Sequence, residues 1–130
     1  MPETQGALRL LRSKVIEDME RYLAEYRLPP AGSTAGNPWS VSKVERELSK
    51  MRDLLVEPYP TKYECDDTLI PVHQRLSKGR RRAYVVAEDG SYRLAFDADA
   101  GDFVLISLAS NGSWYSWGIR GDASGSFLAR

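Results

Sequence analysis

Cysteine and histidine are almost absent from this sequence, which has one of each, Cys65 and His73. A single cysteine excludes an internal disulfide and a cysteine-based zinc cluster, and it fits a reducing compartment. Long apolar runs are absent too: none approaches the roughly 18 residues that a membrane-spanning helix needs, and the first residues lack the apolar stretch of a signal peptide. We therefore expect a soluble, cytoplasmic protein without a membrane partner.

An excess of either charge is also missing. The 18 lysines and arginines balance the 18 aspartates and glutamates, for a formal net charge of zero. The absence of a basic field argues against nucleic-acid binding as the main activity. The hydrophobic fraction is 42%, which is ordinary for a globular chain of 130 residues. We predict one α+β domain over residues 1–130.

No catalytic or cofactor signature is complete. Ser40 and Lys43 have the S-x-x-K spacing of penicillin-binding enzymes, but the accompanying S-D-N and K-T-G motifs are missing. Cys65 and His73 are joined by a proline-flanked stretch that defines no geometry for a thiolate–imidazole pair. Residues 97–102 resemble the start of a calcium loop, but their glycine comes one position early and the closing glutamate is absent. We predict a non-enzymatic protein without cofactor or metal.

Two amphipathic helices are predicted in the first part of the chain. The first has apolar residues at steps of three and four and ends before Pro29-Pro30. The second begins near Ser42, which with Glu45 fits a capping box. From Glu57 to Arg82, three prolines predict an extended connection across the fold, and its end, KGRRR at 78–82, is predicted to be an exposed basic loop.

The last third predicts a four-stranded antiparallel meander at 83–88, 91–98, 102–110 and 113–119. Asp89-Gly90 and Asn111-Gly112 are two-residue hairpin signals. For the middle turn, a three-residue loop at 99–101 with a bulge gathers the apolar residues on one face, whereas a four-residue loop at 98–101 would scatter them. We choose the three-residue loop. The face predicted to lie under the helices consists of Val85, Ala87, Tyr92, Leu94, Phe96, Val104, Ile106, Leu108, Tyr115, Trp117 and Ile119.

The tripeptide Arg120-Gly121-Asp122 is the one that integrins read in extracellular proteins. Short motifs of this kind occur often by chance, and nothing else in the sequence indicates secretion. Glycine ends a strand readily, and aspartate is a preferred N-cap residue. We predict that Gly121 ends the last strand and that Asp122 caps a short C-terminal helix.

The second face of the meander is predicted to bind a partner. It is too apolar for plain solvent exposure, and aromatic and arginine side chains dominate the energy of protein interfaces. We therefore predict Tyr84, Arg93, Phe103 and Trp114 as partner-binding residues. Two alternatives stay open: residues 57–82 cover this face, or a second copy covers it in a homodimer.

The stretch YVVAEDGSYRLAFDADAGDFVLI, followed by DASGSFLA, resembles the later half of the SUKH superfamily over residues 84–128. SUKH proteins share a D-G turn, a strand that ends in an apolar residue and Asp, a glycine turn, another apolar strand and a terminal helix around Phe-Leu. Many are immunity proteins that bind and neutralise bacterial polymorphic toxins. The resemblance implies a toxin-neutralising protein without catalytic residues, which binds its toxin through the exposed sheet face and neighbouring loops.

The basic residues before Tyr84 indicate a second candidate function. Lys78, Arg80, Arg81 and Arg82 precede Tyr84, and basic residues beside an aromatic ring are typical of nucleic-acid contacts. This pattern predicts a nucleic-acid or nucleoprotein accessory factor that uses the basic segment 78–82.

Overall fold

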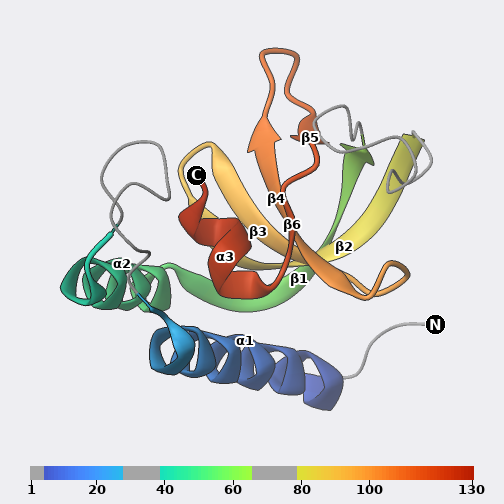
Figure 1. Cartoon of the computed structure of the whole chain (residues 1–130). Coiled ribbons are helices and arrows are strands. Elements are labelled where there is room, and N and C mark those ends of the chain that lie inside the picture. Colours follow the sequence, from blue (N-terminus) through green and yellow to red (C-terminus); the bar gives the residue numbers. More distant parts are fainter. Residues whose placement is uncertain (1–4, 28–38, 66–78) are drawn as a thin grey trace.

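A computed structural model describes residues 5–27, 39–65 and 79–130. Over these ranges the fold is α+β, with three helices and a mixed six-stranded sheet. In Figure 1, α1 lies below the strands, α2 lies at the left beside β1, and α3 lies in front of the strands. The elements in chain order are α1 (Gln5–Glu25), α2 (Val41–Asp53), β1 (Leu55–Cys65), β2 (Gly79–Asp89), β3 (Tyr92–Asp97), β4 (Asp102–Leu108), β5 (Trp114–Ser116), β6 (Arg120–Gly121) and α3 (Ala123–Leu128).

Both predicted N-terminal helices are present, but α2 begins earlier than expected. Ser40 is its N-cap, with an extended backbone, and the Ser40 hydroxyl accepts a hydrogen bond from the backbone N–H of Lys43 at 3.1 Å. The predicted capping box of Ser42 and Glu45 is therefore wrong. The Ser40–Lys43 spacing that resembles a catalytic motif is a helix cap, because a capping side chain bonds the amide two or three residues on.

The strands close into a ring. β1 pairs with β2 and β5, β3 pairs with β2 and β4, and β4 pairs with β5. In an up-and-down succession of five strands the first and the fifth run in the same direction, so the closing pair must be parallel. Glu64 lies opposite Tyr115 and Cys65 opposite Ser116 in such a parallel pair. The predicted four-stranded antiparallel meander is therefore only part of a mixed sheet.

The prediction of an extended connection over residues 57–82 is wrong at both ends of that segment. Residues 57–65 belong to strand β1, and residues 79–82 belong to strand β2. β1 contains Pro58 and Pro60. Proline cannot donate a hydrogen bond to a neighbouring strand, so within sheets it occurs at edges and bulges. The register of β1 against β2 shifts between Leu55 and Tyr59, around Pro58. β1 accommodates its prolines through this irregularity. Residues 79–82 of the predicted basic loop begin strand β2, and Lys78 lies outside the described residues.

The β2–β3 turn lies one residue later than predicted. Asp89 pairs with Tyr92, so the two loop residues are Gly90 and Ser91. Gly90 has a φ of 59°, which glycine adopts without a steric penalty, and it stands at the first central position as in a type II′ turn. A further register shift falls at Val86, between Val85 and Ala87. Because of this shift, Val85 and Ala87 lie on opposite faces of the sheet, whereas the sequence predicted them on the same face.

The β3–β4 turn is the four-residue loop at 98–101. Asp97 pairs with Asp102, and Phe96 pairs with Phe103. The predicted three-residue loop is therefore wrong. The choice rested on gathering all apolar residues on one face, and that premise fails because both faces of these strands are buried.

The β4–β5 hairpin also differs from the prediction by one residue. Leu108 pairs with Trp114, and the backbone N–H of Ala109 donates to the carbonyl of Ser113 at 2.8 Å. The loop is therefore 110–112, whose last residue is a glycine with a φ of 86°. A three-residue loop that ends in a left-handed glycine is a common hairpin connection. The shift turns Trp114 to the face that was predicted for Tyr115.

The ring gives the protein two apolar cores. One lies between the helices and the outer surface of the strands, and the other fills the interior of the ring. Neither face of the central strands is exposed, which is why alternation in the sequence cannot distinguish them. The outer core includes Val15, Met19, Val44, Leu48, Met51, Val86, Ala87, Leu94, Phe103, Leu105 and Phe127. The inner core consists of Tyr63, Cys65, Ala83, Val85, Ala95, Val104 and Ile106.

The C-terminal helix forms as predicted. Gly121 is the last residue of β6, and the side chain of Asp122, the N-cap of α3, accepts a hydrogen bond from the backbone N–H of Gly125. The Arg-Gly-Asp tripeptide thus serves as a strand end and a helix cap. α3 packs against the outer face, where Phe127 is fully buried.

Candidate functional site

The structure divides the four predicted partner-binding residues into two pairs. Tyr84 and Phe103 belong to the outer core, where Phe103 is only 9% exposed. Arg93 pairs with Ile106 and so faces the interior of the ring, and Trp114 packs against the inner core. The four residues therefore do not form the single exposed face that the sequence predicts.

Arg93 and Trp114 meet at one mouth of the ring. The Arg93 guanidinium carbon lies 3.9 Å from the centroid of the Trp114 ring and 5.7 Å from that of Tyr59. Glu88 pairs with Arg93 at 3.4 Å and accepts a hydrogen bond from the Tyr59 hydroxyl. Burial and this hydrogen bond raise the pKa of Tyr59 to about 12. The cation is thus held between aromatic faces and a carboxylate, an arrangement that fixes the position of Trp114.

The Arg93–Trp114 cluster supports the β4–β5 hairpin, which extends above the rest of the sheet in Figure 1. Leu108 lies opposite Trp114 at the base of the hairpin and is 46% exposed. The hairpin therefore carries apolar side chains on its inward face, and Trp114 anchors it to the ring.

The outward face of the same strands carries a second set of aromatic side chains. Ser107 of β4 pairs with Tyr92 of β3 on one side and with Tyr115 of β5 on the other. Residues paired across strands project from the same face of a sheet, so the two tyrosines share a face. The ring of Trp117 stacks on Tyr115, with centroids 5.5 Å apart and planes 12° from parallel. We call Tyr92, Tyr115 and Trp117 the aromatic row.

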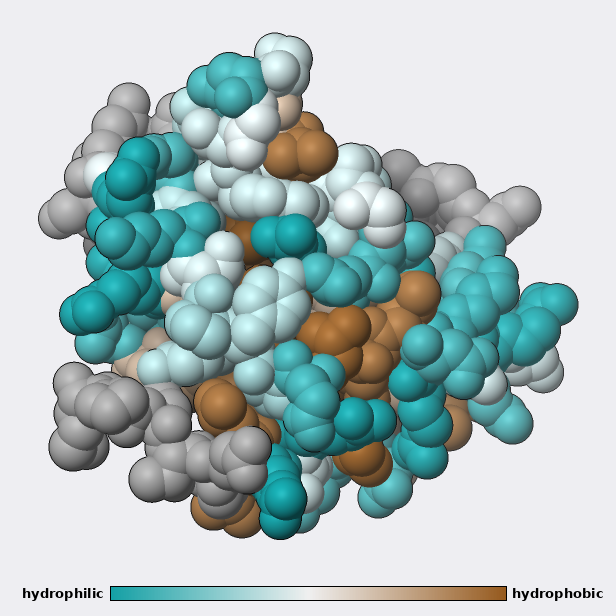
Figure 2. All heavy atoms as spheres, turned by 180° about the vertical axis from the view of Figure 1, so that it is seen from behind, coloured by the Kyte–Doolittle hydropathy of each residue, from teal (hydrophilic) through white to brown (hydrophobic). Residues whose placement is uncertain are grey.

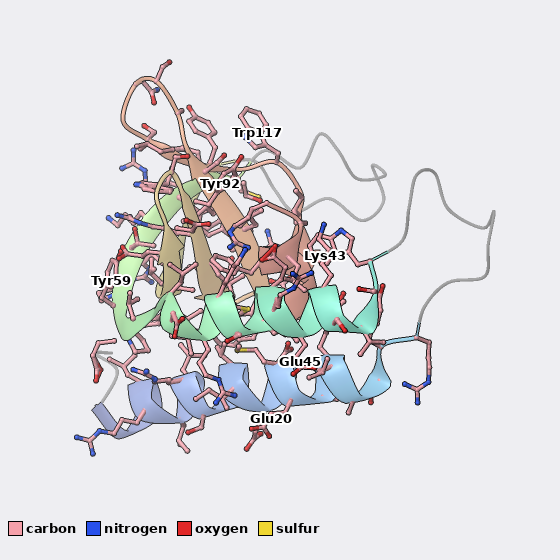
Figure 3. The ribbon with its side chains drawn as sticks, turned by 90° about the vertical axis from the view of Figure 1, so that its left-hand side faces the viewer. Glu20, Lys43, Glu45, Tyr59, Tyr92 and Trp117 are labelled. Carbon is pink, nitrogen blue, oxygen red and sulfur yellow. The ribbon has the colours of Figure 1, made fainter. Side chains whose placement is uncertain are left out.

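The aromatic row is accessible. Tyr92 is 38% exposed and Trp117 is 44% exposed, which is high for such large side chains. Figure 3 shows both near the top of the molecule, far from the helices that carry Glu20 and Glu45. All three residues of the row were predicted to lie in the core. The prediction failed at Trp117 because β5 ends at Ser116, so strand alternation does not extend to it.

The opposite end of the ring is filled by a buried polar network. Asp97 is fully buried and accepts hydrogen bonds from the Tyr63 hydroxyl at 2.6 Å and from Arg81 at 2.7 Å. Arg120 pairs with Asp102 at 2.8 Å and reaches Asp97 at 3.5 Å. Two arginines thus balance two aspartates, as buried charges require. The network closes this end of the ring.

The hydrogen bonds in this network control the protonation of Asp97. Burial alone would raise the pKa of the Asp97 carboxyl, but the hydrogen bonds it accepts, that from Arg81 foremost, lower the pKa to about 2. The pKa of the Tyr63 phenol is raised, first by burial and then by its hydrogen bond to Asp97. Asp97 is therefore ionised and Tyr63 neutral at physiological pH.

Two of the three arginines in the described part of the basic segment, residues 79–82, form ion pairs with carboxylates. Arg80 pairs with Glu64 at 3.2 Å, and Arg81 pairs with the buried Asp97. Arg82 is exposed on the outer face of β2. The structure therefore separates these arginines onto different faces of one strand, instead of gathering them in a loop.

Within residues 5–27, 39–65 and 79–130, no group of three or more His, Cys, Asp or Glu side chains is placed to hold a metal ion. No helix in these ranges is long and apolar enough to cross a membrane. Comparison of the chain with family models, curated proteins and solved structures finds no match.

Proposed function

We propose that this chain is a non-enzymatic protein-binding module whose docking surface is the aromatic row on the β4–β5 hairpin and the adjoining start of β3. The observation that carries the proposal is the exposure of two large aromatic side chains, Tyr92 and Trp117, at the end of the ring far from α1 and α2. Tyrosine and tryptophan bury a large area at low entropic cost and dominate interface energies.

Contacts on both faces of the hairpin restrain the aromatic side chains that it carries. Stacking on Tyr115 restricts the Trp117 ring, and Arg93 holds Trp114 on the other face. A rigid surface loses little conformational entropy when it binds, which raises affinity for a given contact area. Arg93 and Trp114, predicted from the sequence as contacts, would act here as positioning residues beneath the hairpin.

The specific form that we propose is an immunity protein that binds and neutralises a bacterial polymorphic toxin. Its support is the resemblance of residues 84–128 to the SUKH superfamily, together with a surface suited to a protein partner. The segment that carries the resemblance runs from β2 to α3 and includes the whole hairpin. The toxin would therefore meet the part of the chain in which the resemblance lies.

Site-specific photo-crosslinking tests the docking surface. The photoreactive residue p-benzoyl-phenylalanine replaces Trp117 in the protein expressed in its native host, and Val41, which is 49% exposed on α2, in a matched control. We expect a discrete heterologous adduct from position 117 that position 41 does not give. Equal adducts at both positions, or none at 117, would contradict the proposal. An adduct of twice the chain's mass would instead show a homodimer.

The toxin-neutralising form needs its own test. The gene immediately upstream is expressed in a susceptible bacterium with and without this chain. We expect growth arrest by the upstream product alone, rescue by the wild-type chain and by Val41→Ala, and weaker rescue by Trp117→Ala. An upstream product without toxicity, or equal rescue by all variants at matched expression, would overturn this form of the proposal.

A further inference from the structure

A hydrophobic groove lies between the first half of α1 and the outer face of β2 and β3, away from the aromatic row. It encloses a cavity of about 240 Å³. The view from behind shows hydrophobic side chains reaching the surface in the lower half of the molecule, where helices meet strands (Figure 2). The groove is lined by Leu8, Leu10, Leu11 and Lys14 of α1 and by Tyr84 and Phe96 of the sheet.

The size of the cavity limits what can enter it. Pockets for small organic ligands usually enclose about 300–1,000 Å³ and bury most of the ligand. At about 240 Å³ this cavity suits one or two apolar side chains that project from a peptide. Leu10 is 66% exposed at its rim, so an inserted side chain would find an apolar contact that water now covers.

The rim of the groove is positively charged. Lys14 lines it, and Arg82 stands two residues before Tyr84, on the same face of β2. Lys62 lies directly opposite Arg82 in the antiparallel pair, and both side chains are exposed. Like charges in this position destabilise a sheet. No ion pair joins any of the three cations to a carboxylate in the described part of the chain, so the rim is left to attract an external anion.

Two exposed carboxylates stand nearby in the described part of the chain. Glu17 lies one helical turn after Lys14 on α1. Asp99 is exposed in the turn after β3, close in sequence to the groove residue Phe96. Glu64, near Lys62, is already paired with Arg80. The two negative charges of Asp99 and Glu17 therefore stand against three positive charges, and the rim keeps a net positive charge. An apolar floor with a basic rim is complementary to an apolar segment flanked by acidic residues.

We propose that this groove binds an acidic peptide segment of a partner protein, with one or two apolar side chains in the cavity and carboxylates against Lys14, Lys62 and Arg82. The site is separate from the aromatic row: Phe96 and Tyr92 are four residues apart along β3, about 13 Å. A nucleic acid fits less well, because the floor is largely aliphatic and Tyr84 and Phe96 pack against the outer core, where bases cannot stack on them.

A random peptide library displayed on phage, selected on the immobilised full-length protein, tests the proposal. We expect the enriched peptides to combine aliphatic or aromatic residues with Asp and Glu. One enriched peptide is then labelled and its affinity measured by fluorescence anisotropy. Lys14→Glu and Arg82→Glu should each weaken binding by about tenfold or more, because each places like charges face to face. Leu10→Ser should weaken it through the lost apolar contact.

Two variants serve as controls. Lys50→Glu changes an exposed lysine on α2, and Trp117→Ala alters only the aromatic row, so both should bind the peptide as the wild type does. Failure to enrich any peptide, enrichment of peptides without acidic residues, or equal binding by the Lys14 and Lys50 variants would overturn the proposal. Tighter binding of a single-stranded oligonucleotide than of the peptide, lost in Arg82→Glu, would overturn it in favour of a nucleic-acid site. Retained binding by Trp117→Ala makes these results independent of the docking surface proposed above.

Discussion

The carboxylate of Asp18 in α1 accepts two hydrogen bonds from Ser124 in α3, one from its backbone N–H at 2.9 Å and one from its hydroxyl at 2.6 Å. A third comes from the backbone N–H of Ala123. Asp18 is only 8% exposed, and Ser124 is fully buried. A side chain near the start of the chain thus satisfies the free amides at the start of the last helix, which would otherwise be buried without partners.

Replacing this acceptor should destabilise the protein. In Asp18→Asn an amide NH₂ group faces N–H donors, so a buried donor loses its partner at a cost of about 1–3 kcal/mol. Urea unfolding measures the change. The neighbouring Glu17 is exposed, and Glu17→Gln should alter stability by no more than about 0.5 kcal/mol. Equal stability of the two variants would show that the Asp18 hydrogen bonds do not hold α3 in place.

Removing the charge of Asp97 should cost more. Asp97→Asn keeps the side-chain shape but leaves the charge of Arg81 without its buried partner, and breaking a buried ion pair in this way costs about 3–5 kcal/mol. The measurement is again the free energy of unfolding. Asp99→Asn, two residues away and exposed, is the matched control. A loss below about 1 kcal/mol in Asp97→Asn would mean that water or a neighbouring group replaces the pair.

The same carboxylate predicts how stability depends on acid. The pKa of Asp97 is lowered from an ordinary value of 3.8 to about 2 in the folded protein. A carboxyl with a lowered pKa contributes stability above its unfolded pKa and loses it as pH falls. We expect the free energy of unfolding to fall between about pH 5 and pH 2, and this component to be missing in Asp97→Asn. An unchanged acid limb in that variant would assign the effect to other carboxylates.

Alkaline titration reports on the other mouth of the ring. The pKa of Tyr59 is raised from 10.0 to about 12, so its contribution to stability is present below pH 10 and is lost as pH rises toward 12. Ultraviolet absorbance of tyrosinate should show a late phase in the folded protein, which Tyr59→Phe reduces. The urea-unfolded chain should titrate in one phase near the ordinary tyrosine value of about 10. A late phase that persists in full in Tyr59→Phe would contradict the assignment.

The two tryptophans of the hairpin should behave differently. Trp117 is 44% exposed, whereas Trp114 is covered on one face by Arg93. Iodide should therefore quench the fluorescence of Trp114→Phe, which retains Trp117, more strongly than that of Trp117→Phe. Trp114→Ala should lower stability by about 1–3 kcal/mol, and Trp117→Ala by less than about 1 kcal/mol. The reverse order in either measurement would place Trp114 outside, as the sequence predicts.

The local signals in the sequence proved more informative than the long-range ones. The predicted cap at Asp122 is observed, because its hydrogen bond involves a residue only three positions on. Each hairpin signal marks a real turn, but the β2–β3 loop lies one residue later than predicted and the β4–β5 loop begins one residue earlier. A change of one residue alters the turn itself very little. It has a large effect on the next strand, because a slip of one residue exchanges the side chains on its two faces. The shift at the β4–β5 loop turned Trp114 to the interior in this way, whereas Tyr92 keeps the predicted face with Leu94 and is exposed because it lies far from α1 and α2.

The candidate site could not be found from the sequence because closure of the ring is not a local property. The two faces of β4 carry Val104 and Ile106 on one side and Phe103 and Leu105 on the other, all buried. Without knowledge that β1 completes a ring, one of these faces must be assigned to a partner, and Phe103 was. The aromatic row lies where the short β5 ends, a feature that hydrophobic periodicity does not register.

The seam of the ring has a further consequence for the behaviour of the protein in concentrated solution. β1 pairs with β5 only at residues 64 and 65, so among the residues that the structure describes no strand lies beside most of one side of β1. Open strand edges invite pairing with strands of other molecules and lead to aggregation. Pro58 and Pro60 lie in this stretch and supply no backbone donor. The two prolines prevented the prediction of β1 as a strand from the sequence. In the folded protein the same prolines should oppose edge-to-edge assembly.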